Sequence, residues 1–189
     1  MMVIVASMIF VYMSIMYLFS RVYKNNTFAD VGWGIGFMLI ALASSIVAKS
    51  FSPRAYLVSF LVYIWGIRIS YYLFKRTWQK PEDRRYQELR IKWGDREPLY
   101  AFFFVFMLQA ILMLIIGYPI VLVHAMQPVS LTWIDGLVVA LWVCGMFWEA
   151  VGDYQLKQFT KNPLNQGRIM QTGLWRYTRH PNYFGESVM

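Results

Sequence analysis

The sequence is poor in charged residues and in cysteine. Only 15% of its 189 residues are charged, whereas a soluble domain usually carries about a quarter, and 58% are apolar. This balance argues against a soluble domain and favours an integral membrane protein. The single cysteine, Cys144, excludes an internal disulfide, and its apolar neighbours suggest a small core residue.

Repeats, linkers and metal-ligand clusters are also lacking. No internal repeat and no low-complexity linker is evident, so we expect one membrane domain over residues 1–189. His124 has no second histidine or carboxylate cluster near it in the sequence, which leaves a metal site unsupported. We interpret His124 as a residue at the membrane interface. No Ser-His-Asp arrangement is supported by spacing alone.

What the chain does contain is five long apolar runs. The first, Met1 to Ser20, has no charged side chain, and about 20 such residues span a bilayer. It lacks the basic start and the cleavage site of a signal peptide, so we expect a retained helix. The prediction is an all-α, polytopic transmembrane helix bundle of about five spanning helices plus the start of a sixth. The other runs cover about residues 31–48, 55–74, 100–124 and 134–151, with a kink expected at Gly117-Tyr118-Pro119 and a sixth segment starting near Glu186.

Lysine and arginine are distributed unevenly between these runs. If the runs alternate across the membrane, one side holds fifteen of these cations and the other only Lys49 and Arg54. Because Lys and Arg collect on the cytoplasmic side, we predict an N-terminus outside and a cytoplasmic RHPNY segment, in a bacterial inner membrane or the endoplasmic reticulum. The net charge of +8 then needs no nucleic acid partner, and the glycosylation pattern at residues 25–27 is a chance match. The fifteen cations are Arg21, Lys24, Lys75, Arg76, Lys80, Arg84, Arg85, Arg90, Lys92, Arg96, Lys157, Lys161, Arg168, Arg176 and Arg179.

Three features lie in or beside the apolar runs. Gly32 and Gly36 are four residues apart, and we interpret them as a helix-packing face, since a nucleotide-binding loop would need a preceding strand. Asp30 is interpreted mainly as a helix cap, with a functional acid at the membrane edge as the alternative. Arg68 either extends toward the membrane surface or meets an acid or a ligand phosphate inside the bundle.

The longest polar segment covers residues 75–98. Tyr86, Leu89 and Trp93 recur there at helical spacing, which predicts a short amphipathic helix on the membrane surface. Its many cations fit either a solvated surface near anionic lipid or a basic wall beside an anionic cofactor.

The end of the fifth run carries charges at a spacing of four. Glu149, Asp153 and Lys157 therefore share one helix face. Asp153 and Lys157 are interpreted most simply as a surface ion pair. Glu149 lies deeper, where a carboxylate is costly, and so indicates a polar cavity at the cytoplasmic end of the bundle.

The stretch TGLWRYTRHPNYFGES gathers cations and aromatic rings just before a further apolar segment. Arg176 and Arg179 offer planar forks suited to phosphate, and His180 adds a donor. The aromatic rings can stack on a flat heterocycle or pack at the level of lipid headgroups. We favour a ligand with one anionic and one planar end over a basic-aromatic membrane belt, because a belt does not explain Asn182 and Glu186.

These residues resemble a known family. TGLWRYTRHPNYFGE is similar to the signature of the steroid 5-alpha reductase-like membrane family, in particular its bacterial-type branch. FADVGWGIGF, WGIRIS, EDRRYQELRIKWG and FWEAVGDYQLKQF fit the same branch in the same order, so the resemblance covers essentially the whole chain. It implies a membrane enzyme that binds NADPH from the cytoplasm and reduces a carbon–carbon double bond conjugated to a carbonyl in a steroid-like lipid.

The resemblance also assigns residues to a site. Asp30 and Tyr183 would be the polar catalytic groups, and no metal is implied. Glu149 stands where the family's reductases more often have an uncharged polar residue, which bears on cofactor choice. The cofactor pocket would be lined by Asp153, Arg179, His180, Asn182, Tyr183 and Glu186, with Lys157, Arg168 and Arg176 as weaker candidates for phosphate contacts.

Two other functions fit the same residues. The isoprenylcysteine carboxyl methyltransferases have a similar Arg-His-Pro segment, so an S-adenosylmethionine-dependent membrane methyltransferase is one alternative. A non-catalytic membrane protein that binds lipid or a partner is the other. The resemblance further implies helices beyond the Asn-Tyr-Phe-Gly-Glu motif, whereas this sequence ends at Met189. We therefore expect the family's C-terminal helices to be lacking and the activity of the chain as given to suffer.

Overall fold

The computed structural model describes residues 1–49, 52–126 and 130–189, and within these ranges every regular element is helical. The contacts divide the chain into two compact units, Met1–Ser130 and Leu131–Met189. Five stretches of the described chain are long and apolar enough to cross a membrane: Met2–Val22, Phe28–Ala48, Pro53–Thr77, Arg84–Ile116 and Trp133–Lys161. The prediction of a polytopic, all-α membrane protein is confirmed.

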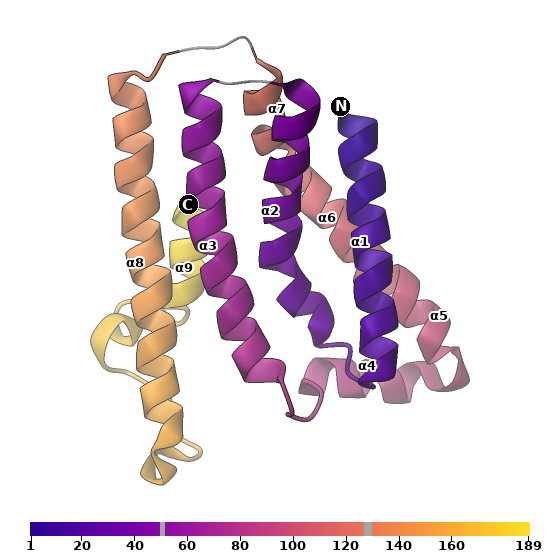
Figure 1. The fold of residues 1–189 in the computed structure, drawn as a ribbon. Helices are drawn as coiled ribbons and strands as arrows, with labels where there is room; N and C mark the ends of the chain where they lie inside the picture. The colour runs from indigo at the N-terminus through magenta and orange to yellow at the C-terminus, as the bar shows by residue number, and fades with distance from the viewer. Residues whose placement is uncertain (50–51, 127–129) are drawn as a thin grey trace. The chain divides into compact units, whose positions relative to one another are not determined.

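The first unit is built around three long helices that run side by side (Figure 1). The core of this unit includes Ile9 of α1 and Ile40 of α2, together with Phe106 from the segment that packs against α1, and none of the three has exposed surface. The elements of this unit are α1 (Met2–Val22), α2 (Phe28–Ala48), α3 (Pro53–Thr77), α4 (Arg84–Trp93), the 3-10 turn η1 (Gly94–Arg96), α5 (Glu97–Ala101), the π-helical turn η2 (Phe102–Met107), α6 (Leu108–Ile116) and α7 (Tyr118–Ala125).

Glycines of α2 allow these helices to approach closely. A Cβ on Gly34 would collide with the carbonyl of Gly66 on α3. A Cβ on Gly36 would lie 2.6 Å from the sulfur of Met113 on α6, and one on Gly32 would lie 3.3 Å from the hydroxyl of Tyr12 on α1. The helix-packing interpretation of Gly32 and Gly36 is therefore confirmed.

The predicted interruption of the fourth apolar run is also present. The helix α6 ends at Ile116, and α7 starts at Tyr118 with a proline in its first turn. Proline lacks the N–H that would continue the preceding helix, and so it fits the start of a new one.

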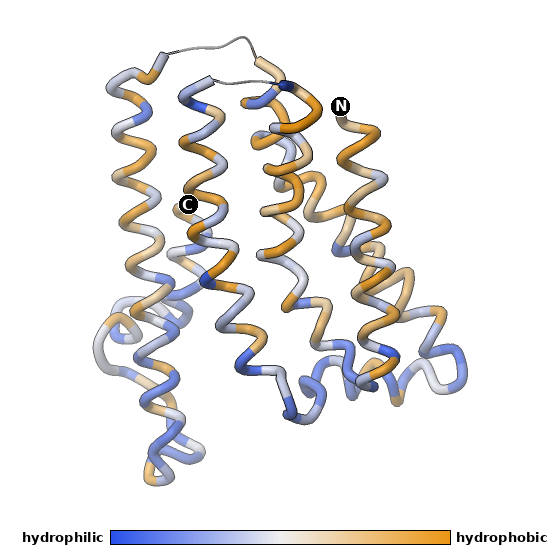
Figure 2. The backbone as a smooth tube through the Cα atoms, in the orientation of Figure 1, coloured by the Kyte–Doolittle hydropathy of each residue, from blue (hydrophilic) through white to orange (hydrophobic). Residues whose placement is uncertain are grey.

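Charged residues gather at one end of the first unit. Figure 2 shows hydrophilic positions in blue where α1 ends and α4 lies, below the mostly apolar long helices. The predicted amphipathic helix is confirmed as α4, which buries Tyr86 toward the unit. Asp83 caps it by accepting a hydrogen bond from the backbone N–H of Arg85 at 3.0 Å.

The turn between α1 and α2 is buried under this charged layer. Asn25, Asn26 and Thr27 are each no more than 6% exposed. The side-chain N–H of Asn26 donates to Glu97 Oε1 at 2.8 Å, and the hydroxyl of Thr27 accepts from the N–H of Asp83 at 2.9 Å. These contacts account for the Asn-Asn-Thr sequence as a structural turn.

The structure also places His124 and Cys144. His124 is buried between α3 and α7: its Nε2 lies 3.0 Å from Ser59 Oγ and its Nδ1 lies 2.8 Å from the Ile120 carbonyl oxygen. Cys144 is exposed, so its interpretation as a small core residue was wrong.

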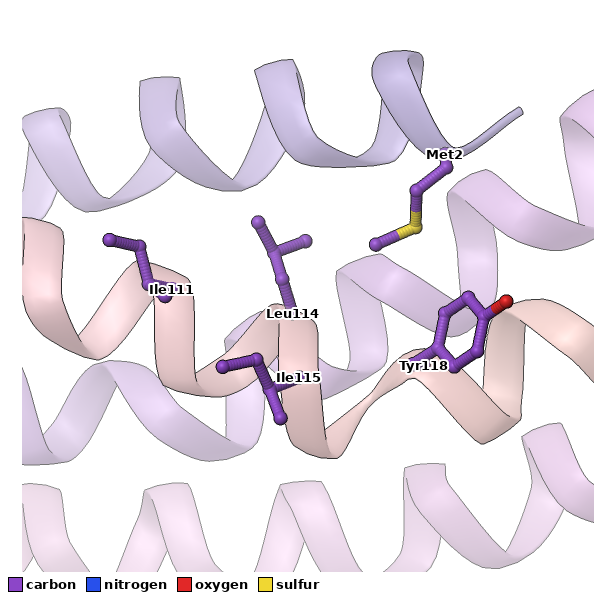
Figure 3. Close-up of a pocket in the computed structure, with 5 residues that line it drawn as sticks. All are labelled: Met2, Ile111, Leu114, Ile115 and Tyr118. Atoms are coloured by element: carbon purple, nitrogen blue, oxygen red, sulfur yellow. The ribbon is translucent and has the colours of Figure 1, made fainter.

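An apolar groove of about 330 Å³ runs between α1 and α6–α7 (Figure 3). Only one of its lining side chains, Tyr118, carries a polar atom other than sulfur. In a membrane protein such a surface meets hydrocarbon. Its lining residues are Met2, Ile111, Leu114, Ile115 and Tyr118.

The second unit consists of α8 (Trp133–Lys161), the 3-10 turns η3 (Pro163–Asn165) and η4 (Gly173–Arg176), and α9 (Pro181–Val188). A capping box between Thr132 and Asp135 starts α8. The helix α9 packs along α8 through glycines, because a Cβ on Gly145 would lie 2.6 Å from the Gly185 carbonyl oxygen. The expected sixth helical segment begins at Pro181, five residues before the predicted start near Glu186.

Candidate functional site

The candidate site lies on the second unit, where the segment 173–188 packs against the C-terminal half of α8. Three polar contacts fasten the segment to the helix. The indole N–H of Trp175 donates to the Gly152 carbonyl at 3.0 Å, and the N–H of Leu174 donates to Gln155 Oε1 at 2.9 Å. The third contact joins Asn182 Nδ2 to Asp153 Oδ1 at 3.1 Å. Asp153 and Asn182, which were predicted to line the same pocket, are thus in contact.

Backbone geometry explains why the segment can approach α8 so closely. Gly152 lies on the packed face, and a Cβ there would lie 3.0 Å from the Asn182 nitrogen. Gly173 has a φ of +62°, in the left-handed region that glycine adopts without strain. Pro181 is buried in the first turn of α9, where its missing N–H costs nothing.

The carboxylates of α8 differ in exposure from the lysine on the same face. Glu149 and Asp153 are only 2% and 4% exposed, whereas Lys157 is exposed. No ion pair connects Lys157 with an acid in the described chain. The interpretation of Asp153 and Lys157 as a surface ion pair was therefore wrong, because Asp153 faces inward and binds Asn182 instead.

The two polar ends of the Asn182 side-chain amide differ: one forms a hydrogen bond and the other does not. Its NH₂ group donates to Asp153, while its Oδ1 is buried and has no hydrogen-bond partner among the described residues. A buried acceptor without a donor costs free energy. This oxygen therefore still has the capacity to accept a hydrogen bond from an N–H or O–H group of a ligand.

The cations and rings of the segment face outward. Arg176, Arg179 and His180 are exposed, and so is Tyr183, at 60%. The rings of His180 and Tyr183 stack with centroids 5.2 Å apart, and Trp175 meets the His180 ring edge-on at 6.4 Å. Neither arginine forms a salt bridge with any acid that the structure describes.

The remaining predicted residues occupy two places. Arg168 is exposed in the loop after η3, and Glu186 is exposed on α9, both in the second unit. Asp30 belongs to the first unit, where its carboxylate accepts from the Tyr86 hydroxyl at 2.7 Å and from Arg85 at 3.0 Å. The N-cap residue of α2 is Thr27, and Asp30 lies inside the first turn, so the capping interpretation was wrong. The Asp30 carboxylate contacts α4 instead.

The sequence reasoning missed the hydrogen-bonded chain that continues from Asp30. The Tyr86 hydroxyl accepts from Gln109 Nε2 at 3.3 Å, and Gln109 Oε1 accepts from the Trp33 indole at 2.9 Å. In this series of hydrogen bonds, each donor group points along the series in the direction of the Asp30 carboxylate. The only sequence signal was a glutamine inside an apolar run, and the π-helical turn directly before it is not visible in the sequence.

The cations of residues 75–98 are partly neutralised. Arg85 pairs with Asp30 and Asp83, and Arg90 pairs with Glu82 at 2.9 Å. Two acids stand directly before two arginines in EDRR, and this proximity of opposite charges is the sequence signal for such pairing. These arginines therefore contribute less to a basic wall than their number suggested.

Comparison with known families supports the membership of nearly the whole chain in one of them. Residues 16–189 match the family model described as "Protein of unknown function (DUF1295)", a membrane-protein family related to steroid 5-alpha reductase-like proteins. Comparison with the curated proteins found no match, and neither did comparison with the solved structures.

Proposed function

The chain belongs to the DUF1295 family, and on this premise we propose that it is a membrane-embedded reductase of the bacterial-type branch. It would use NADPH to reduce a carbon–carbon double bond in a steroid-like or other lipid enone. One observation carries the proposal: hydrogen bonds fasten the segment 173–188 to α8, while its cations are exposed and pair with no acid that the structure describes.

The exposed cations fit the phosphate groups of NADPH. Guanidinium forks bind phosphate oxygens in pairs, and exposed arginines keep their donors available. Arg176 and Arg179 are proposed as the main phosphate contacts, with Lys157 and Arg168 as further cations of the same unit. The acids of the described chain leave all four of these cations unneutralised, in contrast to Arg85 and Arg90 of the first unit.

The planar end of the cofactor fits the other groups. The stacked rings of His180 and Tyr183 offer an exposed aromatic surface, and the Asn182 Oδ1 offers a hydrogen-bond acceptor without a partner. Asp153 holds Asn182 in place, and Glu186 would accept a hydroxyl of the cofactor. When bound, NADPH would supply the hydride, and the protein would orient and polarise the substrate.

Asp30 and Tyr183 are proposed as polar catalytic groups. Tyr183 has a phenol that is exposed on α9 and can donate to a substrate carbonyl. Asp30 is held by Arg85 and Tyr86, so it would act as an oriented carboxylate. The long apolar helices supply the route by which a hydrophobic substrate would arrive from the bilayer.

The proposal is tested by ligand-dependent thermal stabilisation of the detergent-purified protein, with NADPH, NADH and S-adenosylmethionine in concentration series. NADPH should raise the unfolding temperature. Arg179→Ala and Asn182→Ala should weaken its binding by about tenfold or more, because a lost hydrogen bond to a charged or buried group costs about 1.5–3 kcal/mol. Arg96→Ala, which removes an exposed arginine of the first unit, is the matched control.

The other outcomes separate the alternatives. Stabilisation by S-adenosylmethionine alone would favour the methyltransferase function. Stabilisation by none of the three ligands would favour a non-catalytic lipid-binding protein. Equal loss of NADPH binding in Arg179→Ala and Arg96→Ala would remove Arg179 from the site.

A further inference from the structure

A small hollow of about 110 Å³ lies in the first unit between the α1–α2 turn and the end of α3. Tyr23 and Phe28 line it from one side and Trp78 from the other. The rings pack on one another, with Tyr23 5.4 Å from Trp78 and 5.6 Å from Phe28 between centroids. The hollow therefore has aromatic walls at the point where two membrane-crossing helices end.

The two sides of the hollow are joined by a buried side chain. Asn25 is 6% exposed; its Nδ2 donates to the Lys80 carbonyl at 3.3 Å and its Oδ1 accepts from the Thr27 N–H at 3.0 Å. The segment after α3 is thus fixed to the turn after α1. The hollow is built by specific polar contacts in addition to the contact of apolar rings.

The backbone on each side has an unusual conformation. Lys24 and Gln79 have φ angles of +50° and +56°. Glycine is the usual residue just after a helix in this conformation, because it has no Cβ to strain. Here the sequence keeps a long polar side chain at both positions, one beside the lining residues Tyr23 and Asn25 and the other itself a lining residue.

The charge around the hollow is positive and not cancelled by nearby acids. Lys80 lines the hollow, and both it and Lys24 are exposed, with no ion pair to any acid in the described ranges. The acid nearest to Lys80 in the chain, Glu82, accepts from Arg90 at 2.9 Å and from the Asn26 N–H at 2.7 Å. The next one, Asp83, is held by Arg85 at 3.3 Å. The two lysines are therefore available to bind an anion.

We propose that this hollow binds the phosphate of an anionic phospholipid in the leaflet that meets this end of the helices. Lys80 and Lys24 supply the charge, and Tyr23 and Trp78 pack at the level of the headgroup and its ester groups. A lipid fits better than free phosphate because three aromatic rings line the hollow, and because it adjoins helices that are long and apolar enough to cross the hydrocarbon. The site uses none of the residues assigned to the reductase and stands independently of that function.

The experiment compares the protein in nanodiscs of phosphatidylcholine with nanodiscs that contain increasing mole fractions of phosphatidylglycerol. The readout is the unfolding temperature, and the affinity is taken from the mole fraction that gives half of the stabilisation. Each of Lys80→Gln and Lys24→Gln should raise that fraction about fivefold, since a lysine near an anionic surface contributes about 1 kcal/mol. Lys92→Gln removes an exposed lysine of α4 in the same unit, which forms no ion pair with the described acids, and is the matched control.

The outcomes are distinct. A weaker affinity for phosphatidylglycerol in Lys80→Gln and Lys24→Gln only, and not in Lys92→Gln, supports the site. An equal loss in Lys92→Gln would mean general charge attraction and overturn it, as would an absence of stabilisation by phosphatidylglycerol in the unaltered protein. Inorganic phosphate is titrated in phosphatidylcholine nanodiscs as a second arm. A Lys80-dependent stabilisation by phosphate, without one by phosphatidylglycerol, would overturn the lipid as occupant.

Discussion

Glu97 connects three parts of the first unit, and removing its carboxylate should destabilise the fold. Its Oε2 lies 2.7 Å from Arg21 Nη1 and 3.2 Å from Arg90 Nη1, and its Oε1 accepts from Asn26 Nδ2 at 2.8 Å. The residue is 4% exposed. In Glu97→Ala both arginines lose this partner, and nothing in the alanine side chain replaces it.

The size of the destabilisation depends on how well water can replace the lost carboxylate as a partner of the two arginines. Removing one partner of a fully buried ion pair costs about 3–5 kcal/mol. Here Arg21 and Arg90 are 23% and 36% exposed in their side chains, and Arg90 keeps Glu82, so solvent and the second acid reduce the loss. We expect about 2–3 kcal/mol, which lowers the unfolding temperature of a chain of this size by about 4–12 °C.

The assay is thermal unfolding in one detergent, with a control from the same surface. Glu88→Ala removes an exposed glutamate that pairs with Arg84, and such helix-surface pairs contribute about 0.5 kcal/mol or less. A double-mutant cycle of Glu97→Ala with Arg21→Met should show a coupling of about 1–3 kcal/mol. Equal destabilisation in Glu97→Ala and Glu88→Ala, or an additive cycle, would refute the assignment of Glu97 as the centre of this network.

Two further predictions concern pH and topology. Burial opposes ionisation of Asp83, but the hydrogen bonds and charges of Arg85 and the charge of Arg76 outweigh it and lower the pKa of this carboxyl. Asp83 therefore contributes stability above its unfolded pKa of about 3.9 that is lost as pH falls through the lower native value, and Asp83→Asn should flatten this part of the pH dependence of the unfolding temperature. In a Cys144→Ser background, Arg179→Cys should react with a membrane-impermeant maleimide only after permeabilisation, whereas Lys49→Cys should react in intact cells; labelling of position 179 from outside would contradict the cytoplasmic placement.

The membrane-crossing helices were predictable because hydropathy is a local property. Their ends were less so, since α8 continues to Lys161, ten residues beyond the predicted end of the fifth run. A run such as Met2–Val22 has the length and composition of a membrane span whatever it packs against. The break at Gly117 was predictable for the same reason, since proline restricts its own neighbourhood. The packing role of Gly32 and Gly36 followed from their spacing on a single helix.

The partners of the buried polar groups were not predictable in this way. Asp30 meets Tyr86 across 56 residues of sequence, and Asn26 meets Glu97 across 71. Periodicity indicates which residues share a helix face, but the rotation of each helix and the register between helices decide which faces meet. For this reason Asp30 was assigned to its own helix start.

The contact between Asp153 and Asn182 differs, because a motif resemblance placed the two residues in one pocket before any packing was considered. The structure supplies the reason for their approach, which is the glycine surface of α8 at Gly145 and Gly152. The motif did not indicate that the Oδ1 of Asn182 would be buried without a hydrogen-bond partner among the described residues.

The two units use their arginines in different ways, and this difference separates stability from binding. In the first unit Arg21, Arg85 and Arg90 each pair with a carboxylate, so their removal should affect folding. In the second unit Arg176 and Arg179 are exposed and pair with no acid of the described chain, and such residues contribute little to folding. Arg179→Ala should therefore leave the ligand-free unfolding temperature almost unchanged, so that any loss of NADPH stabilisation in this variant reports on binding and not on a damaged fold.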